Sequence, residues 1–261
     1  MCLFSEVTKN EKRSPLKEKP LRNPGQSLDE QLDQIKWDML SFLLAPLLLV
    51  FLAIWEWWSW YLKSPPHPIA ATILAIILLG YCIPKFFKLR RRRRNIELGR
   101  DGEKVVGQAL EGLRQQGCLV FHDVVGKNFN VDHVIVSTHG IFSIETKTYS
   151  KPTNVNSKVT FNGENILVAG KSIYPSPVEQ AKASAKWLCC DILHESTGKW
   201  FPVKPVVVFP GWWVNEQKTG EVWVLNPDGL KYCIDREPEM LTEEDMHLVV
   251  YHLSRFIRAT G

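Results

Sequence analysis

Two long apolar runs near the N-terminus constrain the fold of this chain more than any other feature. The first extends from Met39 to Trp55 and the second from Ile69 to Ile83, and neither contains a charged residue. With its flanking residues, each run reaches the ~20 residues that a helix needs to cross a bilayer. We expect two antiparallel helices, at about 39–60 and 68–87. Two buried core helices of a soluble domain are the alternative interpretation.

The residues that flank these runs favour a membrane location. Aromatic residues gather at the hairpin end of the first run, as in the aromatic belt of a membrane interface: Trp55, Trp57, Trp58, Trp60 and Tyr61. Lys85, Lys88 and Arg90–Arg94 directly follow the second run. We therefore expect a transmembrane helical hairpin over residues 37–89.

The distribution of basic residues predicts how this hairpin is oriented. About seven Lys and Arg residues lie in residues 1–36 and seven between Lys85 and Arg94, whereas the hairpin loop has only Lys63. Because basic residues favour the inner side of a membrane, both termini and the soluble domain are expected in the cytoplasm. The sequence thus predicts a multi-pass protein of the cell (inner) membrane with a flexible cytoplasmic tail over residues 1–36. Within that tail, Leu28, Leu32 and Ile35 have helical spacing, which makes Ser27–Trp37 a candidate short amphipathic helix.

The basic collar, residues 90–94, is a candidate binding site for anionic lipid head groups. An arginine near such a surface gains about 1 kcal/mol from it. Nucleic-acid binding is the competing interpretation, because a run of arginines also attracts phosphates. The position of the collar directly after a spanning helix favours the lipid bilayer as its partner.

Charge and composition limit which classes of protein and which binding sites remain possible for this chain. The net charge is +4, yet residues 95–261 contain 17 Lys and Arg against 20 Asp and Glu. The positive excess therefore belongs to the tail and the collar, and it argues for membrane topology more than for nucleic-acid binding. A hydrophobic content of 45% excludes a disordered chain. The six cysteines form no C-x-x-C pair that would indicate a zinc site.

The periodicity from residue 95 onward is typical of an α/β (α+β) domain. The sequence predicts helices over 95–116, 177–193 and 242–257, and strands over 118–124, 131–136, 141–148, 159–161, 165–168, 205–209 and 221–225. Asn162-Gly163 marks a hairpin turn between two of these strands.

One predicted hairpin brings charged side chains together. Glu145 and Lys147 share a face, because residues two apart on a strand point the same way. If the turn consists of Thr138 and His139 alone, Asp132 lies directly opposite Glu145 on that face. A bulge at Gly140 would instead shift the pairing by one residue and turn Asp132 away.

These side chains match the needs of a hard cation. Mg²⁺ prefers oxygen ligands and needs only one or two protein carboxylates beside water and substrate phosphate. Mn²⁺ is the second candidate. The nearby Lys147 is suited to orient or deprotonate an attacking water and to stabilise charge on a phosphate.

Three segments together resemble the nuclease-related domain (NERD) family, which is similar to the PD-(D/E)xK restriction-endonuclease-like superfamily. They are Gly99-Arg-Asp-Gly-Glu103, Val131-Asp132-His133 and Gly140-Ile-Phe-Ser-Ile-Glu145-Thr-Lys147. The resemblance covers about residues 95–210. It implies a core with a central mixed sheet flanked by helices, within a nuclease domain over 95–261. Val131 stands where the wider superfamily has proline.

The resemblance also implies roles for individual residues. Glu103, Asp132, Glu145, Lys147 and Gln180 match the family's catalytic positions. Asp132 and Glu145 would hold Mg²⁺, and Glu103 would assist directly or through water. Gln180 would contact the substrate backbone or the water at the metal.

The expected function is Mg²⁺-dependent hydrolysis of nucleic acid at the membrane, with DNA favoured over RNA. The alternative is a catalytically inactive module that binds nucleic acid or protein partners there. Two further interpretations stay open: a zinc site formed by three histidines (His122, His133 and His139), and base stacking by Trp212 and Trp213.

Overall fold

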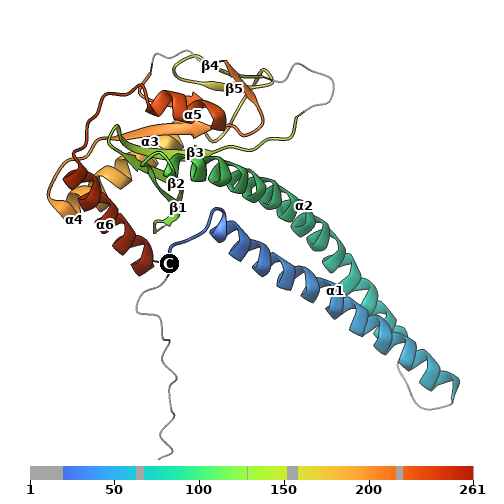
Figure 1. Ribbon diagram of the computed structural model, residues 1–261. Helices are drawn as coiled ribbons and strands as arrows, with labels where there is room; N and C mark the ends of the chain where they lie inside the picture. Colours follow the sequence, from blue (N-terminus) through green and yellow to red (C-terminus); the bar gives the residue numbers. More distant parts are fainter. Residues whose placement is uncertain (1–19, 63–67, 128, 152–157, 216–219, 261) are drawn as a thin grey trace, which may run out of the picture.

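A computed structural model of the chain describes residues 20–62, 68–127, 129–151, 158–215 and 220–260. It has two parts, a long helical stalk and a globular domain (Figure 1). The stalk is formed by α1 (Gln26–Tyr61) and by the first part of α2 (Pro68–Arg114). Most of the predicted tail and the hairpin loop, residues 63–67, lie outside the described residues.

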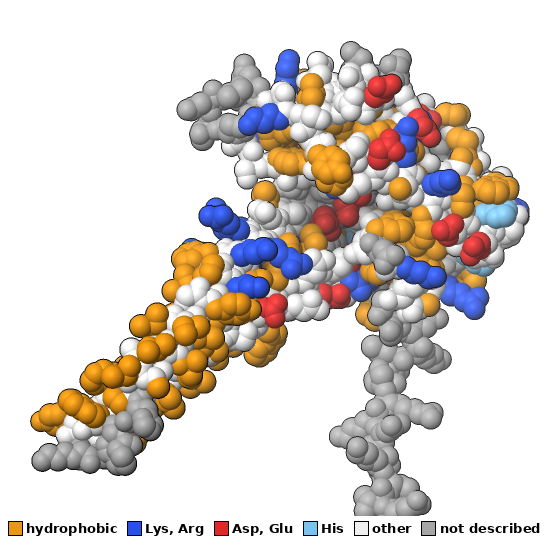
Figure 2. Space-filling model, turned by 180° about the vertical axis from the view of Figure 1, so that it is seen from behind, with side chains coloured by type: hydrophobic (Ala, Val, Ile, Leu, Met, Phe, Trp, Pro, Cys, Tyr) orange, Lys and Arg blue, Asp and Glu red, His pale blue; other side chains and the backbone are white. Residues whose placement is uncertain are grey.

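Both stalk helices are long and apolar enough to cross a membrane, judged by length and composition. They lie side by side, and apolar side chains cover the part of the stalk far from the globular domain (Figure 2). Near the hairpin end, the Trp57 indole Nε1–H donates a hydrogen bond to Thr72 Oγ1 over 3.0 Å. The expected helical hairpin is therefore present.

The second helix continues where the sequence suggested separate segments. α2 runs without interruption through the collar and into the globular domain, as a single helix of 47 residues. Arginine is a good helix former, and the Arg93 Nε–H donates to Glu97 Oε1 over 2.7 Å one turn later. At 1.5 Å per residue, Glu103 lies roughly 22 Å along the helix from Lys88, close to the end of the apolar run.

The first helix contains both the first apolar run and the amphipathic segment 27–37. α1 starts at Gln26, inside the segment assigned to the tail, directly after Gly25 in a left-handed conformation. Leu32 and Ile35 are almost fully buried, and Asp29 forms ion pairs with Arg100 and Lys104 of α2. These contacts explain why residues 26–36 are helical and attached to α2, and not part of a flexible tail.

The globular domain contains the expected central mixed sheet. Its strand order is β1-β2-β3-β7-β9, with antiparallel pairing from β1 to β3 and parallel pairing from β3 to β9. The strands are β1 (Leu119–Val125), β2 (Asn130–Ser137), β3 (Gly140–Thr146), β7 (Val203–Val208) and β9 (Trp223–Leu225).

Helices cover both faces of this sheet, so its strands are apolar on both sides. The end of α2 and α5 (Pro227–Ile234) pack on one face, around Ile135, Phe142 and Val206. The π-helical segment η1 (Leu188–His194) and α6 (Glu243–Thr260) pack on the other, around Val134, Val136 and Ile141. The sequence analysis did not identify α5, a short amphipathic helix whose first residues are Pro227 and Asp228.

A second, smaller sheet extends the domain. Its strand order is β6-β5-β4-β8, and it packs with α3 (Pro177–Trp187) on Val207 and Phe209. Asn162 stabilises the predicted β4–β5 turn, because its side-chain oxygen accepts the backbone N–H groups of Glu164 and Asn165. The remaining elements are β4 (Lys158–Phe161), β5 (Ile166–Val168), β6 (Lys171–Ser172), β8 (Trp213–Asn215) and α4 (Glu195–Thr197).

Candidate active site

The turn between β2 and β3 decides where Asp132 points. Ser137 pairs with Gly140 and His133 pairs with Ile144, so the turn has two residues and Gly140 forms no bulge. The expected register is confirmed over these pairs, and its continuation by one residue beyond His133 places Asp132 opposite Glu145. Asp132 Oδ2 accepts a hydrogen bond from the Thr146 backbone N–H over 2.7 Å, which fixes the carboxylate at the end of the ladder.

The E-x-K pair forms a direct ion pair. Lys147 Nζ lies 2.6 Å from Glu145 Oε1, and the two side chains are 22% and 12% exposed. The Lys147 backbone N–H donates to Val208 O over 2.9 Å, which keeps the chain beside β7 after β3 ends. Burial lowers the pKa of Lys147, but the charge and hydrogen bond of Glu145 outweigh it and raise the pKa above its ordinary value. Lys147 is therefore an ammonium group.

A close approach of α2 brings Glu103 to the same region. A Cβ atom on Gly102 would lie 1.7 Å from Thr148 Oγ1 and 2.8 Å from Thr148 Cβ. Only glycine permits this contact, which presses α2 against the segment that follows β3. The Gly-x-x-Gly-Glu pattern thus has a packing cause: Gly102 lets the neighbouring Glu103 approach Glu145 and Lys147.

The carboxylates of this region carry perturbed pKa values. Glu103 is only 9% exposed, and burial together with the charges of Asp123 and Glu145 raises its pKa to about 8. Burial and the charges of Glu145 and Glu103 raise the pKa of Asp132 well above its usual range. The hydrogen bond from Thr146 and the charge of Lys147 oppose this rise without cancelling it. Carboxylates that repel one another in this way favour a bound cation.

Gln180 reaches the site from α3. Ser176 caps this helix by accepting the Glu179 backbone N–H, and Pro177 occupies its first position. Gln180 and Glu145 line one cavity of about 530 Å³. Gln180 Oε1 is buried and has no hydrogen-bond partner among the described residues. The structure therefore brings all five predicted site residues to the region where β2, β3, α2 and α3 meet.

The oxygen donors of the site limit which metal ion it could hold. Among the described residues, no group of three or more His, Cys, Asp or Glu side chains is spaced to hold one. Asp132 and Glu145 by themselves meet the minimum for Mg²⁺, which takes its remaining ligands from water and substrate. Burial and the charges of Glu145 and Glu103 raise the pKa of Asp132, and a cation beside these carboxylates would offset both effects. Glu103 fits a water-mediated role.

The three histidines do not form one site. His122 Nδ1 lies 2.9 Å from His133 Nδ1, and both rings are buried. His139 is in the turn at the other end of β2, where Nδ1 contacts the Glu237 carbonyl oxygen over 2.6 Å. Trp212 is also structural: it is buried and its indole N–H donates to Tyr149 O. Trp213 is largely exposed.

Asp123 is a residue that the sequence analysis missed. It is buried at φ 51°, in a left-handed conformation that Asp tolerates better than most residues. Its carboxylate accepts hydrogen bonds from Arg22 Nε, Ser27 N and Asn130 Nδ2 at 2.7, 2.9 and 3.1 Å. Asn130 in turn lines the cavity beside Glu145. Pairing β1 with β2 from the sequence would have placed Asp123 opposite Asp132.

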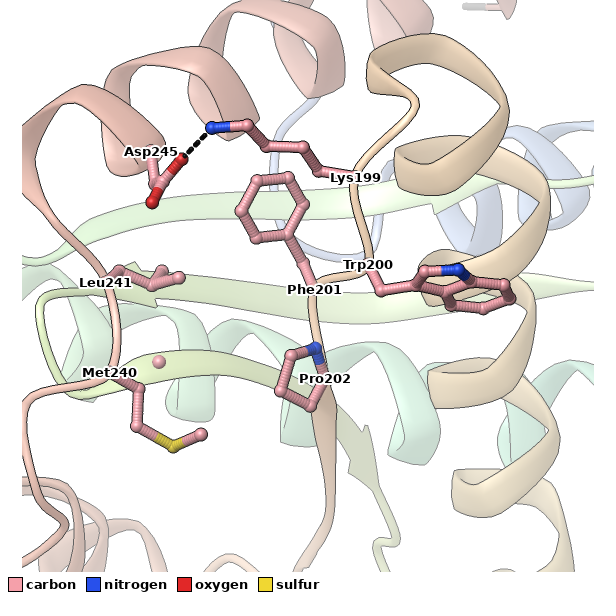
Figure 3. Close-up of a pocket in the computed structure, with 8 residues that line it drawn as sticks. Lys199, Trp200, Phe201, Pro202, Met240, Leu241 and Asp245 are labelled. Atoms are coloured by element: carbon pink, nitrogen blue, oxygen red, sulfur yellow. Dashed lines mark hydrogen bonds and ion pairs between the residues drawn. The ribbon is translucent and has the colours of Figure 1, made fainter.

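A second cavity, of about 340 Å³, lies at the opposite end of β3, beside Gly140 (Figure 3). Trp200 and Met240 contribute apolar side chains there, and Lys199 Nζ pairs with Asp245 Oδ1 over 2.7 Å. It contains none of the five predicted site residues. In the view of Figure 2, acidic side chains occupy a hollow between the stalk and the globular domain, and Lys and Arg side chains gather on the adjacent stalk.

Comparison with known proteins gives a family for this part of the chain. Residues 98–210 match the family model of the nuclease-related domain, NERD. No curated protein and no solved structure gives a significant match. The matched range includes Glu103, Asp132, Glu145, Lys147 and Gln180. The match identifies residues 98–210 as a nuclease-related domain.

Proposed function

We propose that this protein is a membrane-anchored, Mg²⁺-dependent nuclease that hydrolyses phosphodiester bonds of nucleic acid. The observation that carries the proposal is the pairing of Asp132 opposite Glu145, with Lys147 bound to Glu145 and Glu103 buried beside them. The match of residues 98–210 to the nuclease-related domain supports the same chemistry. DNA is the first substrate to test.

The carboxylates would bind the metal. Asp132 and Glu145 are the ligands, and Glu103 contributes through water because its carboxyl group is buried and readily keeps its proton. A bound Mg²⁺ would supply a Lewis acid at the phosphate and lower the pKa of a bound water. Thr146 would hold Asp132 in place through its backbone N–H.

Lys147 acts as a cation in this proposal. Its raised pKa favours orienting water and stabilising negative charge on the phosphate over accepting a proton. Glu145 fixes the ammonium group at 2.6 Å, so little reorganisation is needed when substrate binds. Hydrolysis adds the water oxygen to phosphorus and breaks one phosphorus–oxygen bond, and the leaving oxygen takes up a proton.

The stalk would anchor this site to the bilayer. Its two apolar helices would cross the membrane with both termini in the cytoplasm, and Arg90–Arg94 would contact anionic lipid head groups. Because α2 is continuous, the membrane span and Glu103 belong to one helix.

Cleavage by the full chain in detergent, with and without Mg²⁺, tests the enzymatic part. We expect Mg²⁺-dependent cutting that falls at least about 100-fold in Asp132→Asn and in Lys147→Ala, because each removes charge from the reacting centre. Glu164→Gln, in the exposed β4–β5 turn, is the matched control and should keep full activity. Cleavage that persists in both site variants would refute the assignment.

Two observations favour the inactive module as a second candidate. Lys147 already occupies an oxygen of Glu145, and no three-residue metal group is present among the described residues. Calorimetric titration with Mg²⁺ separates the two functions. A nuclease should bind Mg²⁺ and lose that binding in Asp132→Asn, whereas the inactive module should show no such dependence.

A further inference from the structure

The cavity beside Glu145 has the size of a small-molecule site. Its volume is about 530 Å³, within the ~300–1,000 Å³ of typical ligand pockets. It is formed by the segment that precedes β2, by β3, by α3 and by the start of η1. Since Glu145 is in its wall, the cavity adjoins the centre proposed to cut the phosphodiester bond.

One wall of this cavity is aromatic and held in place. The Phe129 and Trp187 rings lie 4.8 Å apart in an edge-to-face arrangement, and Trp187 packs in the same way on Phe256. The Gly126 backbone N–H donates to Phe129 O over 2.8 Å, which links Phe129 to the residue that follows β1. Phe129 is nevertheless 41% exposed. A supported and exposed ring is a suitable stacking surface.

The charged groups of the cavity are mainly carboxylates, and its uncharged polar residues, Asn130, Gln180 and Ser184, can both donate and accept. The Gln180 Oε1 atom is buried without a partner among the described residues, and Asp191 adds a carboxylate. Glu145 adds a second carboxylate, and Lys186 is the one basic residue in the lining. This balance disfavours an anionic phosphate. It favours a flat, neutral group that donates hydrogen bonds from its edge.

We propose that this cavity is a subsite for one unpaired nucleobase adjacent to the bond that is cut. Phe129 would stack on the face of the base, and Gln180 and Asp191 would accept hydrogen bonds from its edge. The inference rests on the proposed nuclease function and adds a substrate class to it. A base inside a duplex cannot enter such a cavity without leaving the stack, so the substrate is single-stranded or has unpaired ends.

The acceptors also predict which bases are preferred. Cytosine and adenine present an exocyclic amino group with two N–H donors, whereas the edge of thymine has one N3–H donor between two carbonyl oxygens. An oligonucleotide of cytosines should therefore bind more tightly than one of thymines. Asp191→Asn, which makes the group a donor as well as an acceptor, should reduce this difference.

Binding by the full chain in detergent tests the subsite without requiring cleavage. Fluorescence anisotropy would measure the affinity of a labelled single strand for the Lys147→Ala variant, with and without Phe129→Ala. We expect Phe129→Ala to weaken binding at least about fivefold, as expected for loss of one stacked base. Phe129→Tyr keeps an aromatic face and should restore affinity. Trp200→Ala removes an exposed aromatic at the other cavity and should have no effect.

The outcomes separate this inference from the proposed nuclease function. Unchanged affinity in Phe129→Ala, or equally tight binding of a fully paired duplex, overturns the subsite even if Mg²⁺-dependent cleavage is found. Phe129-dependent binding of single strands supports the subsite even if the wild-type chain cuts nothing, a result that refutes the nuclease function alone.

Discussion

Asp123 Oδ2 accepts a hydrogen bond from the backbone N–H of Ser27 over 2.9 Å and so ties β1 to the start of α1. Arg22 Nε lies 2.7 Å from the same oxygen, and the Arg22 and Asp123 side chains are only 9% and 2% exposed. Asn130, which lines the candidate substrate cavity, also donates to Ser27 Oγ and Asp123 Oδ1. Arg22 and the first turn of α1 thus support the candidate site.

Asp123→Asn should destabilise the globular domain. Asn tolerates the positive φ of this position, so the main loss is the charge that pairs with the buried Arg22. Removing one partner of a buried ion pair costs about 3–5 kcal/mol. We expect a loss of about 3 kcal/mol in the free energy of unfolding, measured by chemical denaturation of the full chain in detergent.

Asp33→Asn is the control for this substitution. It breaks the Asp33–Lys36 pair, in which both side chains are more than half exposed, and should cost less than about 1 kcal/mol. Arg22→Met combined with Asp123→Asn should recover part of the loss. Equal destabilisation by Asp123→Asn and Asp33→Asn would contradict a buried role for Asp123.

Gly102→Ala should disturb both stability and the site. The added methyl group would overlap the Thr148 side chain, which is next to Lys147 in the sequence. Overpacking of this kind costs about 1–3 kcal/mol. Because α2 must move away, Glu103 should lose its position beside Glu145, and cleavage should fall with stability. Thermal denaturation and cleavage rates would be measured on the same preparations.

Gly112→Ala is the matched control in the same helix. A Cβ there would meet no atom within 4 Å, so only the helix propensity changes. Alanine should then stabilise the chain by about 0.5–1 kcal/mol. If both glycine variants gained stability, the close approach of α2 to Thr148 would be disproved.

The β2–β3 hairpin was predictable because its pairing depends on residues that are close together in the sequence. Because side chains alternate between the two faces of a strand, Glu145 and Lys147 were placed on one face. The two-residue turn then determined which residue lies opposite Asp132. Glu103 was found through its motif and not through a contact, because its distance from Glu145 depends on how α2 packs. The Gly102–Thr148 contact that sets this packing joins residues far apart in the sequence.

The contacts of the N-terminal segment could not be predicted in the same way. Arg22 and Asp123 are 101 residues apart, and no periodicity links them. The prediction of a boundary at the collar was wrong for a different reason. Its arginines suggested a boundary between two units, yet arginine favours helix, and nothing in residues 85–101 ends α2.

Glu103→Gln should make stability less dependent on pH. The pKa of Glu103 is about 8 in the folded chain against an ordinary value of 4.5, so the folded state holds the proton more tightly. The stabilising contribution is complete below about pH 4.5 and is lost as the pH rises through 8. Glutamine cannot ionise. Without Mg²⁺, we expect this variant to melt at least about 2 °C above the wild type at high pH, with little difference in acid.

Two measurements check the cause of this effect. Glu164→Gln, at an exposed turn, should show the same melting temperature as the wild type throughout the pH range. Added Mg²⁺ should stabilise the wild type more than Glu103→Gln at neutral pH. If the melting temperatures of Glu103→Gln and the wild type differed by the same amount at every pH, ionisation of Glu103 would be excluded as the cause.

The apolar surface of the stalk predicts how the chain behaves in membranes. Leu48 on α1 and Ile76 and Ile77 on α2 are each more than 60% exposed, which a soluble helix pair would avoid. The full chain should therefore remain with the membrane through a high-salt wash and be released by detergent. Leu48→Asp with Ile76→Asp should reduce the membrane fraction, because a central Asp costs about 2.5–3.5 kcal/mol in a spanning helix. Tyr251→Asp, on the exposed side of α6, should leave it unchanged.

Membrane vesicles that contain the full chain test the predicted orientation. In inside-out vesicles, added protease should degrade residues 95–261, and in sealed vesicles of the opposite orientation it should not. Release by salt alone would mean that Arg90–Arg94 hold the chain on the surface by charge, since screening weakens such contacts but not an apolar span. In that case the exposed face of α1 and α2 would need a protein partner in place of lipid.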